Sequence, residues 1–304
     1  MPNTGTDGPV IAVALQTDGK VLVGGDFTAV NGNAGFRRLA RLNSSGSLDT
    51  SFNPGTSADL PVFDIALQGD GKIVIAGAFT HFNGTPRNYL ARLNANGSLD
   101  AGFDAGTVLD GSALSLAIQP FDGKIIAAGV FGQALPPSPF PTTNLAVRSF
   151  VARFQTNGAL DSAFAPSLDG SVLSLALQPD GKLIMVGDFT VVTGVSRSRV
   201  ARLKLDGSVD DHFNPGAGAD AIIYSVSQGT DGKVFVGGDF THFDGSARNR
   251  VARLNGSPNV AELLPLALNP SRQFQISLAG VPLAPLITVV TTVHVMKFVV
   301  ASIR

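Results

Sequence analysis

Two sets of arginines recur at fixed places in the chain and together could bind an anion. The first set occupies one position of a repeated Ala-Arg-Leu or Ala-Arg-Phe block and comprises Arg41, Arg92, Arg153, Arg202 and Arg253. The second set stands five residues before the last four of these and comprises Arg87, Arg148, Arg197 and Arg248. Guanidinium groups bind phosphate, sulfate or a polyanion through paired hydrogen bonds.

A structural role competes with anion binding for both sets. Four turns that follow the first set carry an aspartate each, namely Asp49, Asp100, Asp161 and Asp210. For the first set we favour ion pairs with these aspartates, which would lock neighbouring units together. The second set lies nearer a loop, and for it both roles stay open.

Aspartates at other places could do acid–base chemistry or bind a cation. Asp26, Asp188 and Asp239 follow the second apolar run of their repeat units. Asp64 lies within a first apolar run, at a position that we align with Ala12, Ser115, Ser174 and Tyr224. Paired carboxylates hydrolyse glycosides at separations of about 5–10 Å, and calcium needs several oxygen ligands. We expect Asp64 to face a central channel as a solvated aspartate rather than a catalytic one.

A glutamine opens the same turn block in every unit and could contribute to a ring of amides. The glutamines are Gln16, Gln68, Gln119, Gln178 and Gln228. Such a ring could bind a polar ligand at a channel mouth, but a buried amide must also satisfy its own hydrogen bonds. We favour the structural role because ligand sites usually depart from the symmetry of a repeat.

The sequence predicts no cofactor and no metal centre. His81 and His242 occupy matching loop positions, but no third ligand accompanies them in the sequence. The chain contains no cysteine, which rules out disulfides and thiolate metal sites.

The third unit contains a proline-rich insertion between Phe131 and Phe150. Its distinctive residues are Gln133, Pro136, Pro137, Pro139 and Phe140. A proline-rich loop is stiff and loses little entropy on binding, so this insertion is a candidate partner-binding element. The alternative is an insertion that the surface merely tolerates.

The elements that must position these residues form five copies of one unit, each about 50–59 residues long. Each copy has an apolar run, an Asp-Gly turn, a second apolar run and then the arginine block, which predicts antiparallel strands joined by hairpins. A polar turn leads to a short fourth segment around Phe52, Phe103, Phe164 or Phe213. We therefore predict an all-β fold, a β-propeller of five repeat units with four-stranded antiparallel blades. The ring is either five-bladed or part of a larger propeller.

The repeated blocks resemble those of a known family. Leu-Gln-x-Asp-Gly-Lys, Val-Gly-Gly-Asp-Phe-Thr, Ala-Arg-Leu-Asn and Gly-Ser-Leu-Asp recur in order over about residues 10–255 and are similar to the bacterial delta-60 repeat. This resemblance implies a β-propeller and an extracellular or cell-surface location, but the family has no shared chemistry to transfer. The double glycines Gly24-Gly25 and Gly237-Gly238 are more distantly similar to the kelch repeat.

The repeats divide the chain into three parts. Residues 1–9 are similar to the end of a preceding unit, residues 10–255 form the propeller, and residues 256–304 are an irregular extension. Residues 273–278 could supply a closing strand or open a truncated module, and a frameshift near Pro282 would explain the change in character. Residues 283–303 could also be a membrane or sorting segment, although Lys297 disfavours this role. No secretory signal is visible in residues 1–20.

Composition narrows the choice of function. A formal net charge of −1 provides no general attraction to nucleic acid or to an anionic membrane. We expect a monomeric, non-catalytic interaction or scaffold module that binds a protein or glycan partner. A carbohydrate-binding or carbohydrate-active propeller is the first alternative, although the chain has only two tyrosines and no tryptophan to stack on sugars. An anion-binding arginine rim is the second alternative.

Overall fold

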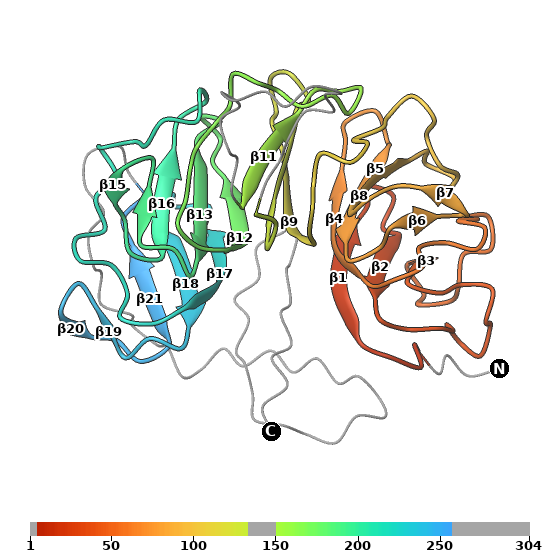
Figure 1. The fold of residues 1–304 in the computed structure, drawn as a ribbon. Coiled ribbons are helices and arrows are strands. Elements are labelled where there is room, and N and C mark those ends of the chain that lie inside the picture. The colour runs from red at the N-terminus through yellow and green to blue at the C-terminus, as the bar shows by residue number, and fades with distance from the viewer. Residues whose placement is uncertain (1–4, 133–149, 257–304) are drawn as a thin grey trace.

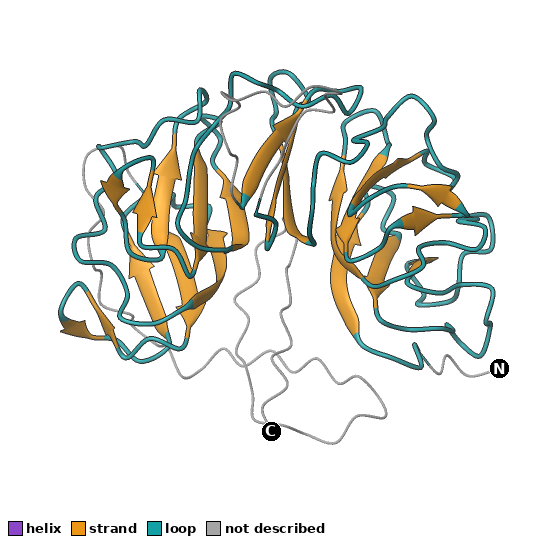
Figure 2. Ribbon diagram, in the orientation of Figure 1, coloured by secondary structure: helices purple, strands orange, loops and turns teal. Residues whose placement is uncertain are grey.

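The computed structural model of the chain describes residues 5–132 and 150–256 (Figure 1). Figure 2 shows that this part consists of strands and loops. None of the described residues belongs to a helix that could span a membrane. The proline-rich insertion and the extension beyond residue 256 lie outside the described residues.

Five antiparallel sheets of three strands each make up the structure. Their strands, in sheet order, are β1 (Val10–Leu15), β2 (Val21–Gly25) and β3 (Leu39–Leu42); β4 (Val62–Leu67), β5 (Ile73–Gly77) and β8 (Leu90–Leu93); β9 (Ala113–Ile118), β10 (Ile125–Gly129) and β11 (Val151–Phe154); β12 (Val172–Leu177), β13 (Leu183–Gly187) and β16 (Val200–Leu203); and β17 (Ile223–Gln228), β18 (Val234–Gly238) and β21 (Val251–Leu254). Small hairpins join the second and third strands of three sheets: β6 (His81–Phe82) with β7 (Thr85–Pro86), β14 (Val191–Val192) with β15 (Val195–Ser196), and β19 (His242–Phe243) with β20 (Ser246–Ala247).

The five sheets stand side by side as blades of an arc, which confirms the predicted all-β propeller of five repeat units. The first strands β1, β4, β9, β12 and β17 follow one another along the inside of the arc (Figure 1). The first and fifth sheets stand apart, so the described residues do not close the ring.

The predicted fourth strand of each blade does not form a full strand among the described residues, which corrects the prediction of four-stranded blades. It is reduced to single bridges, Leu42 with Leu48, Leu93 with Leu99, Phe154 with Leu160 and Leu203 with Val209. The chain turns immediately afterwards, because the N–H of Phe52 donates to the carbonyl of Asp49 at 3.2 Å, as Phe103 does to Asp100 at 3.3 Å. A backbone used in a tight turn cannot extend a ladder.

The core lies between neighbouring blades rather than within one. Leu22 and Leu39 of the first unit, for example, share a cluster with Val62, Ile65 and Ile75 of the second. The phenylalanine two residues beyond each second strand is fully buried in all five units: Phe27, Phe79, Phe131, Phe189 and Phe240. Each blade therefore depends on its neighbours to remove its apolar faces from water.

Each inner strand carries one β-bulge at the same place, and this bulge fixes the alignment of the units. In the fifth unit Ile223 pairs with Gly238 and Ser225 with Gly237, so Ser225, and not Tyr224, is the counterpart of Asp64. Tyr224 is instead the residue in the bulge, and its counterparts are Ile11, Phe63, Leu114 and Leu173. The expected alignment of Tyr224 with Asp64 is wrong by one residue.

The glutamine position shifts in the same unit. The N–H of Gln16 donates to Lys20 O at 2.8 Å, and in the fifth unit Gly229 makes this bond with Lys233 at 2.8 Å. Gln228 is still paired with Val234 inside the ladder. Gln228 is therefore not the fifth member of the expected ring, because Gly229 takes the turn position and Gln228 stays in the ladder.

Candidate functional site

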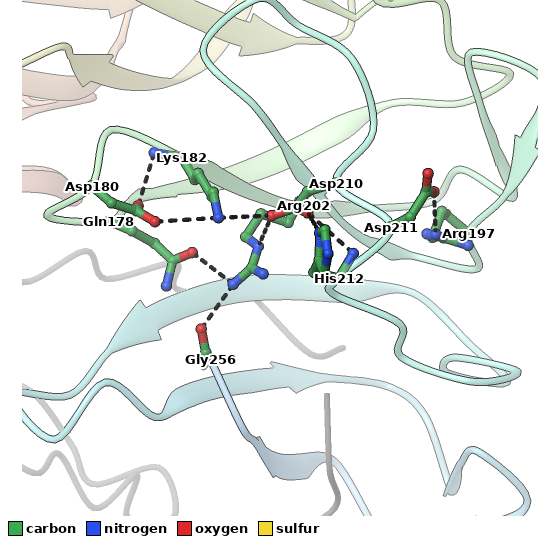
Figure 3. A network of polar contacts seen from close by, with 9 residues as sticks. All are labelled: Gln178, Asp180, Lys182, Arg197, Arg202, Asp210, Asp211, His212 and Gly256. Atoms are coloured by element: carbon green, nitrogen blue, oxygen red, sulfur yellow. Dashed lines mark hydrogen bonds and ion pairs between the residues drawn. The ribbon is translucent and has the colours of Figure 1, made fainter. Parts of the chain in front are cut away.

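The arginine in the third strand of each of the first four units joins that unit to the next. Figure 3 shows the example of Arg202, whose Nε donates to Asp210 Oδ2 at 2.9 Å and whose Nη1 donates to Gln178 Oε1 at 3.1 Å. Nη1 also donates to the carbonyl of Gly256 in the fifth unit at 2.8 Å. The guanidinium lies over the ring of Phe213 at 4.9 Å, close enough for a cation–π interaction.

The same contacts recur in the preceding units. Arg41, Arg92 and Arg153 donate through Nε to Asp49, Asp100 and Asp161 at 2.7–2.8 Å. Each also reaches a turn carbonyl of the following unit, at Ala95, Thr156 or Leu205 respectively. We call each set of arginine, aspartate and carbonyl an inter-blade latch. These four arginines are 1–8% exposed, so their guanidinium groups interact with groups inside the fold and not with an external anion.

The latch aspartates stay ionised over a wide pH range. Burial opposes ionisation of Asp100, but hydrogen bonds from Lys72, the Gly102 N–H and Arg92 outweigh it and lower its pKa to about 2. The pKa of Asp49, Asp161 and Asp210 is lowered in the same way, each with burial opposed by a lysine, a backbone N–H and the arginine. The fifth arginine, Arg253, lies opposite Phe235 in the β18–β21 ladder.

The repeated glutamines contribute to the latches. Gln16, Gln119 and Gln178 accept from their latch arginines at 3.5, 3.3 and 3.1 Å. Gln68 keeps its two backbone turn bonds, from its N–H to Lys72 O at 2.9 Å and from the Gly71 N–H to its carbonyl at 3.0 Å, and its buried Oε1 accepts no hydrogen bond from the described residues.

Two members of the second arginine set form ion pairs with aspartates, and Arg248 forms none among the described residues. Arg87 pairs with Asp104 and Arg197 with Asp211, both at 3.3 Å. Each also donates to the carbonyl of the residue before it, as Arg248 does to Ala247 at 2.8 Å. Arg148 lies outside the described residues.

Asp64 does not face a channel as a solvated group, and this expectation is corrected. It is only 3% exposed, and its Oδ1 accepts from the N–H of Ile65 at 2.9 Å. Its Oδ2 accepts from the N–H of Leu116 on the next inner strand at 2.6 Å. Ser115 does the same for Leu175 at 2.9 Å, so this position links successive inner strands.

Sequence reasoning missed a clasp made by the aspartate in the linker before four of the five blades. Asp59 accepts from the N–H groups of Thr80 and His81 at 2.9 and 3.1 Å and from the Thr80 hydroxyl at 2.8 Å. Three other pairs repeat the clasp at the same separation of 21 residues: Asp7 with Thr28, Asp169 with Thr190, and Asp220 with Thr241. That constant separation is the signal that could have identified it.

The clasp also accounts for the two matching histidines. The N–H of His242 and the Thr241 hydroxyl donate to Asp220 and lower its pKa. His81 and His242 lie 3.4 and 3.3 Å from the aspartate of their own clasp. The described residues contain no group of three or more His, Cys, Asp or Glu side chains that could hold a metal ion.

One end of the blades carries five bulky residues in the left-handed backbone region. They directly precede the third strands and are Arg38, Tyr89, Phe150, Arg199 and Arg250, with φ between 61° and 70°. Each N–H donates to the carbonyl of a buried phenylalanine at 2.8–3.0 Å, and each carbonyl accepts from the glycine that ends the second strand at 2.9–3.2 Å. The fold therefore holds a conformation that costs a non-glycine residue about 1–2 kcal/mol.

The residue that follows each second strand varies together with the left-handed residue of the same unit. The residue just after each second strand is Asp26, Ala78, Val130, Asp188 or Asp239. The three arginines face the three aspartates, in Arg38 with Asp26, Arg199 with Asp188, and Arg250 with Asp239. The units with Tyr89 and Phe150 have Ala78 and Val130 instead. We call these ten residues the blade-end rim.

The blade-end rim is our candidate functional site because it combines exposed charge with aromatic side chains. Asp239 and Arg250 are 54% and 71% exposed, and Val130 is 49% exposed. Gly132 and Phe150, which flank the proline-rich insertion, border or belong to the rim. The insertion residues Gln133, Pro136, Pro137, Pro139 and Phe140 themselves lie outside the described residues.

Several solved structures are similar to this chain at low identity. A protein of unknown function from Bacteroides caccae is 13% identical, with a TM-score of 0.46 over 84% of this chain and 81% of that one. Virginiamycin B lyase from Staphylococcus aureus is 14% identical, with a TM-score of 0.47 over 88% of each chain. A gluconolactonase from Xanthomonas campestris is 16% identical, with a TM-score of 0.44 over 74% of this chain and 68% of that one.

No curated protein matches the sequence. A family model described as "Domain of unknown function (DUF5122) beta-propeller" matches residues 16–52, 68–103, 122–164, 178–213 and 229–257, together more than half of the chain. The matched segments span the turns, second strands, latches and buried phenylalanines described above, and the fifth begins at Gly229, in agreement with the register of β17. The chain belongs to the DUF5122 β-propeller family.

Proposed function

We propose that this chain is a non-catalytic interaction module whose partner-binding surface is the blade-end rim. One observation carries the proposal. Left-handed positions elsewhere in the units are filled mainly by glycine and asparagine, for which the conformation costs little, whereas the rim positions hold arginine, tyrosine and phenylalanine. Side chains of these types dominate binding energy at protein interfaces.

The rest of the polar structure supports a scaffold role. The latch arginines, the clasp aspartates and Asp64 all bond within or between blades, so their chemistry holds the arc together. The hydrogen bond to Asp239 is the main cause that raises the pKa of Tyr224, and burial raises it further. The Tyr224 hydroxyl therefore stays protonated and acts as a donor.

We place the module outside the cell or on the surface of a bacterium. The support is the resemblance of its repeat blocks to the bacterial delta-60 repeat.

A carbohydrate partner is the second candidate. It is favoured by the mixture on the rim of aromatic rings with both signs of charge, which can stack on a sugar and exchange hydrogen bonds with its hydroxyls. Anion binding is disfavoured because the rim arginines face aspartates.

Glycine substitutions on the rim test the proposal. The double variant Arg38→Gly/Arg250→Gly should keep or raise the melting temperature, because glycine relieves the backbone strain, and should lose binding to the partner. Binding would be measured on a printed glycan array and with a phage-displayed peptide library. Thr193→Gly is the matched control, since Thr193 has a φ of 49° in the turn between β14 and β15, away from the rim. If the rim variant binds every probe that the native chain binds, the proposal is wrong.

A further inference from the structure

Tyr224 stands apart within its row of bulge residues. The counterparts of this side chain in the other units are Ile11, Phe63, Leu114 and Leu173, so only the fifth unit presents a hydroxyl there. The Tyr224 hydroxyl donates to Asp239 Oδ2 at 2.6 Å. Asp239 follows β18 directly, and Tyr224 therefore connects the inner strand of the fifth unit to the blade-end rim.

A second carboxylate approaches from the neighbouring blade. Asp188 follows β13 of the fourth unit, and its partner Arg199 donates through Nη1 to the carbonyl of Ala219, in the linker before β17, at 2.9 Å. This contact brings the ion pair to the fifth unit, and the charge of Asp188 adds to that of Asp239 in raising the pKa of Tyr224. Both aspartates are accessible, with side chains 46% and 54% exposed.

The two arginines that accompany these aspartates have guanidinium N–H groups that make no close hydrogen bond among the described residues, although Arg199 Nη1 donates to the Ala219 carbonyl. Arg199 Nε lies 3.6 Å from Asp188 Oδ1, and Arg250 Nη1 lies 3.6 Å from Asp239 Oδ1, both beyond a good hydrogen bond. In the first unit, by contrast, Arg38 is hydrogen-bonded directly to Asp26.

The charges of this group cancel, and that determines the kind of ligand it suits. Two carboxylates would repel an anion and two guanidinium groups would repel a cation. Four carboxylate oxygens accept and the guanidinium groups donate, so a neutral molecule that does both fits best. The bulge residue of the fourth unit, Leu173, is partly exposed and offers an apolar surface to the C–H groups of such a molecule.

We propose that Tyr224, Asp188, Asp239, Arg199 and Arg250 form a binding subsite for a neutral oligosaccharide. The proposal rests on the blade-end rim being the binding surface and adds the class of ligand and the two blades that bind it. The carboxylates accept from vicinal hydroxyls, the guanidinium groups donate to hydroxyl and ring oxygens, and the Tyr224 ring packs on the sugar.

The test is isothermal titration of the chain with neutral hexasaccharides of glucose, xylose and N-acetylglucosamine and with hexagalacturonate as the anionic comparison. We expect at least one neutral hexasaccharide to bind. Tyr224→Phe removes the hydroxyl that positions Asp239, and Asp188→Asn removes a charged acceptor, so each should weaken that binding by about tenfold. Asp211→Asn is the control, because it neutralises an exposed aspartate of the fourth unit that is not part of the blade-end rim, and it should leave the Kd within about twofold.

Three results would overturn the subsite: no binding of any neutral hexasaccharide, preferential binding of hexagalacturonate, or equal affinity in Tyr224→Phe, Asp188→Asn and the native chain. Failure of the subsite can be distinguished from failure of the proposed function. Suppose that a displayed peptide binds the native chain and Tyr224→Phe equally well but does not bind the Arg38→Gly/Arg250→Gly variant. That result would support the interaction module and contradict the oligosaccharide subsite. If no probe depended on the rim, both proposals would be lost.

Discussion

Arg202 and Asp210 form an ion pair that water does not reach: Nε and Oδ2 are 2.9 Å apart, and each side chain is 1% exposed. The pair connects β16 to the turn that follows it, and the same guanidinium donates to Gly256 of the next blade. A buried ion pair adds little net stability compared with a well-packed apolar pair, but the loss of one partner leaves a charge without compensation.

Asp210→Ala should therefore lower the free energy of unfolding by about 3–5 kcal/mol, because Arg202 remains buried and charged. Urea denaturation measures the change. Asp211→Ala is the control, since Asp211 is the next residue in the chain but has a side chain that is 79% exposed. We expect a change within about 0.5 kcal/mol for the control. Similar losses for the two variants would contradict the latch.

Asp64 should tolerate serine better than alanine. Ser115 and Ser174 at the equivalent positions accept the same inner-strand N–H through their hydroxyls. Asp64→Ala leaves the buried Leu116 N–H without this acceptor, at a cost of about 1–3 kcal/mol, whereas Asp64→Ser retains one. Urea denaturation of both variants, with hydrogen exchange of the Leu116 amide, checks the order. Equal stability of the two variants would show that the contact contributes nothing.

The latches should open in acid. Because the pKa of Asp100 falls from 3.8 to about 2 on folding, ionised Asp100 stabilises the fold above pH 3.8, and this contribution is lost as the pH falls toward 2. Asp49, Asp161 and Asp210 act in the same direction. The melting temperature should fall steeply between about pH 4 and pH 2. Asp100→Asn should be less stable at neutral pH and have a shallower slope over this window; an unchanged slope would contradict the assignment.

The third unit lacks the clasp threonine and can be given one. Gly132 occupies the place of Thr80, and a Cβ there would lie 3.8 Å from Asp110 Oδ2, an ordinary contact. Gly132→Thr should place a hydroxyl beside this carboxylate and raise the free energy of unfolding by about 0.5–1 kcal/mol. Gly132→Val, which has the same shape without the hydroxyl, is the control in the same urea titration. If valine stabilises as much as threonine, backbone stiffening and not the clasp is responsible.

The repeat pattern alone was enough to predict the all-β propeller, its five units and the hairpins at the Asp-Gly turns, because those features follow from residues close together in the chain. The pairing of latch arginines with turn aspartates was also foreseeable, since Arg41 and Asp49 are separated by only eight residues and recur together. The hydrogen bond from each latch arginine to a carbonyl of the next blade could not be foreseen, because the partners are far apart in the sequence, by 54 residues for Arg41 and Ala95.

Only the tertiary structure decided the rest. The bulge in each inner strand shows that Ser225, and not Tyr224, is the counterpart of Asp64. The difference of one residue matters because it turns a side chain to the other face of a strand. The buried carboxylate of Asp64 accepts a hydrogen bond from the N–H of Leu116, which belongs to the next blade, and no local sequence pattern reveals this contact. The blade-end rim likewise emerges only in the folded chain, because the left-handed residues of the five units are far apart in sequence and the fold places each at the start of its third strand.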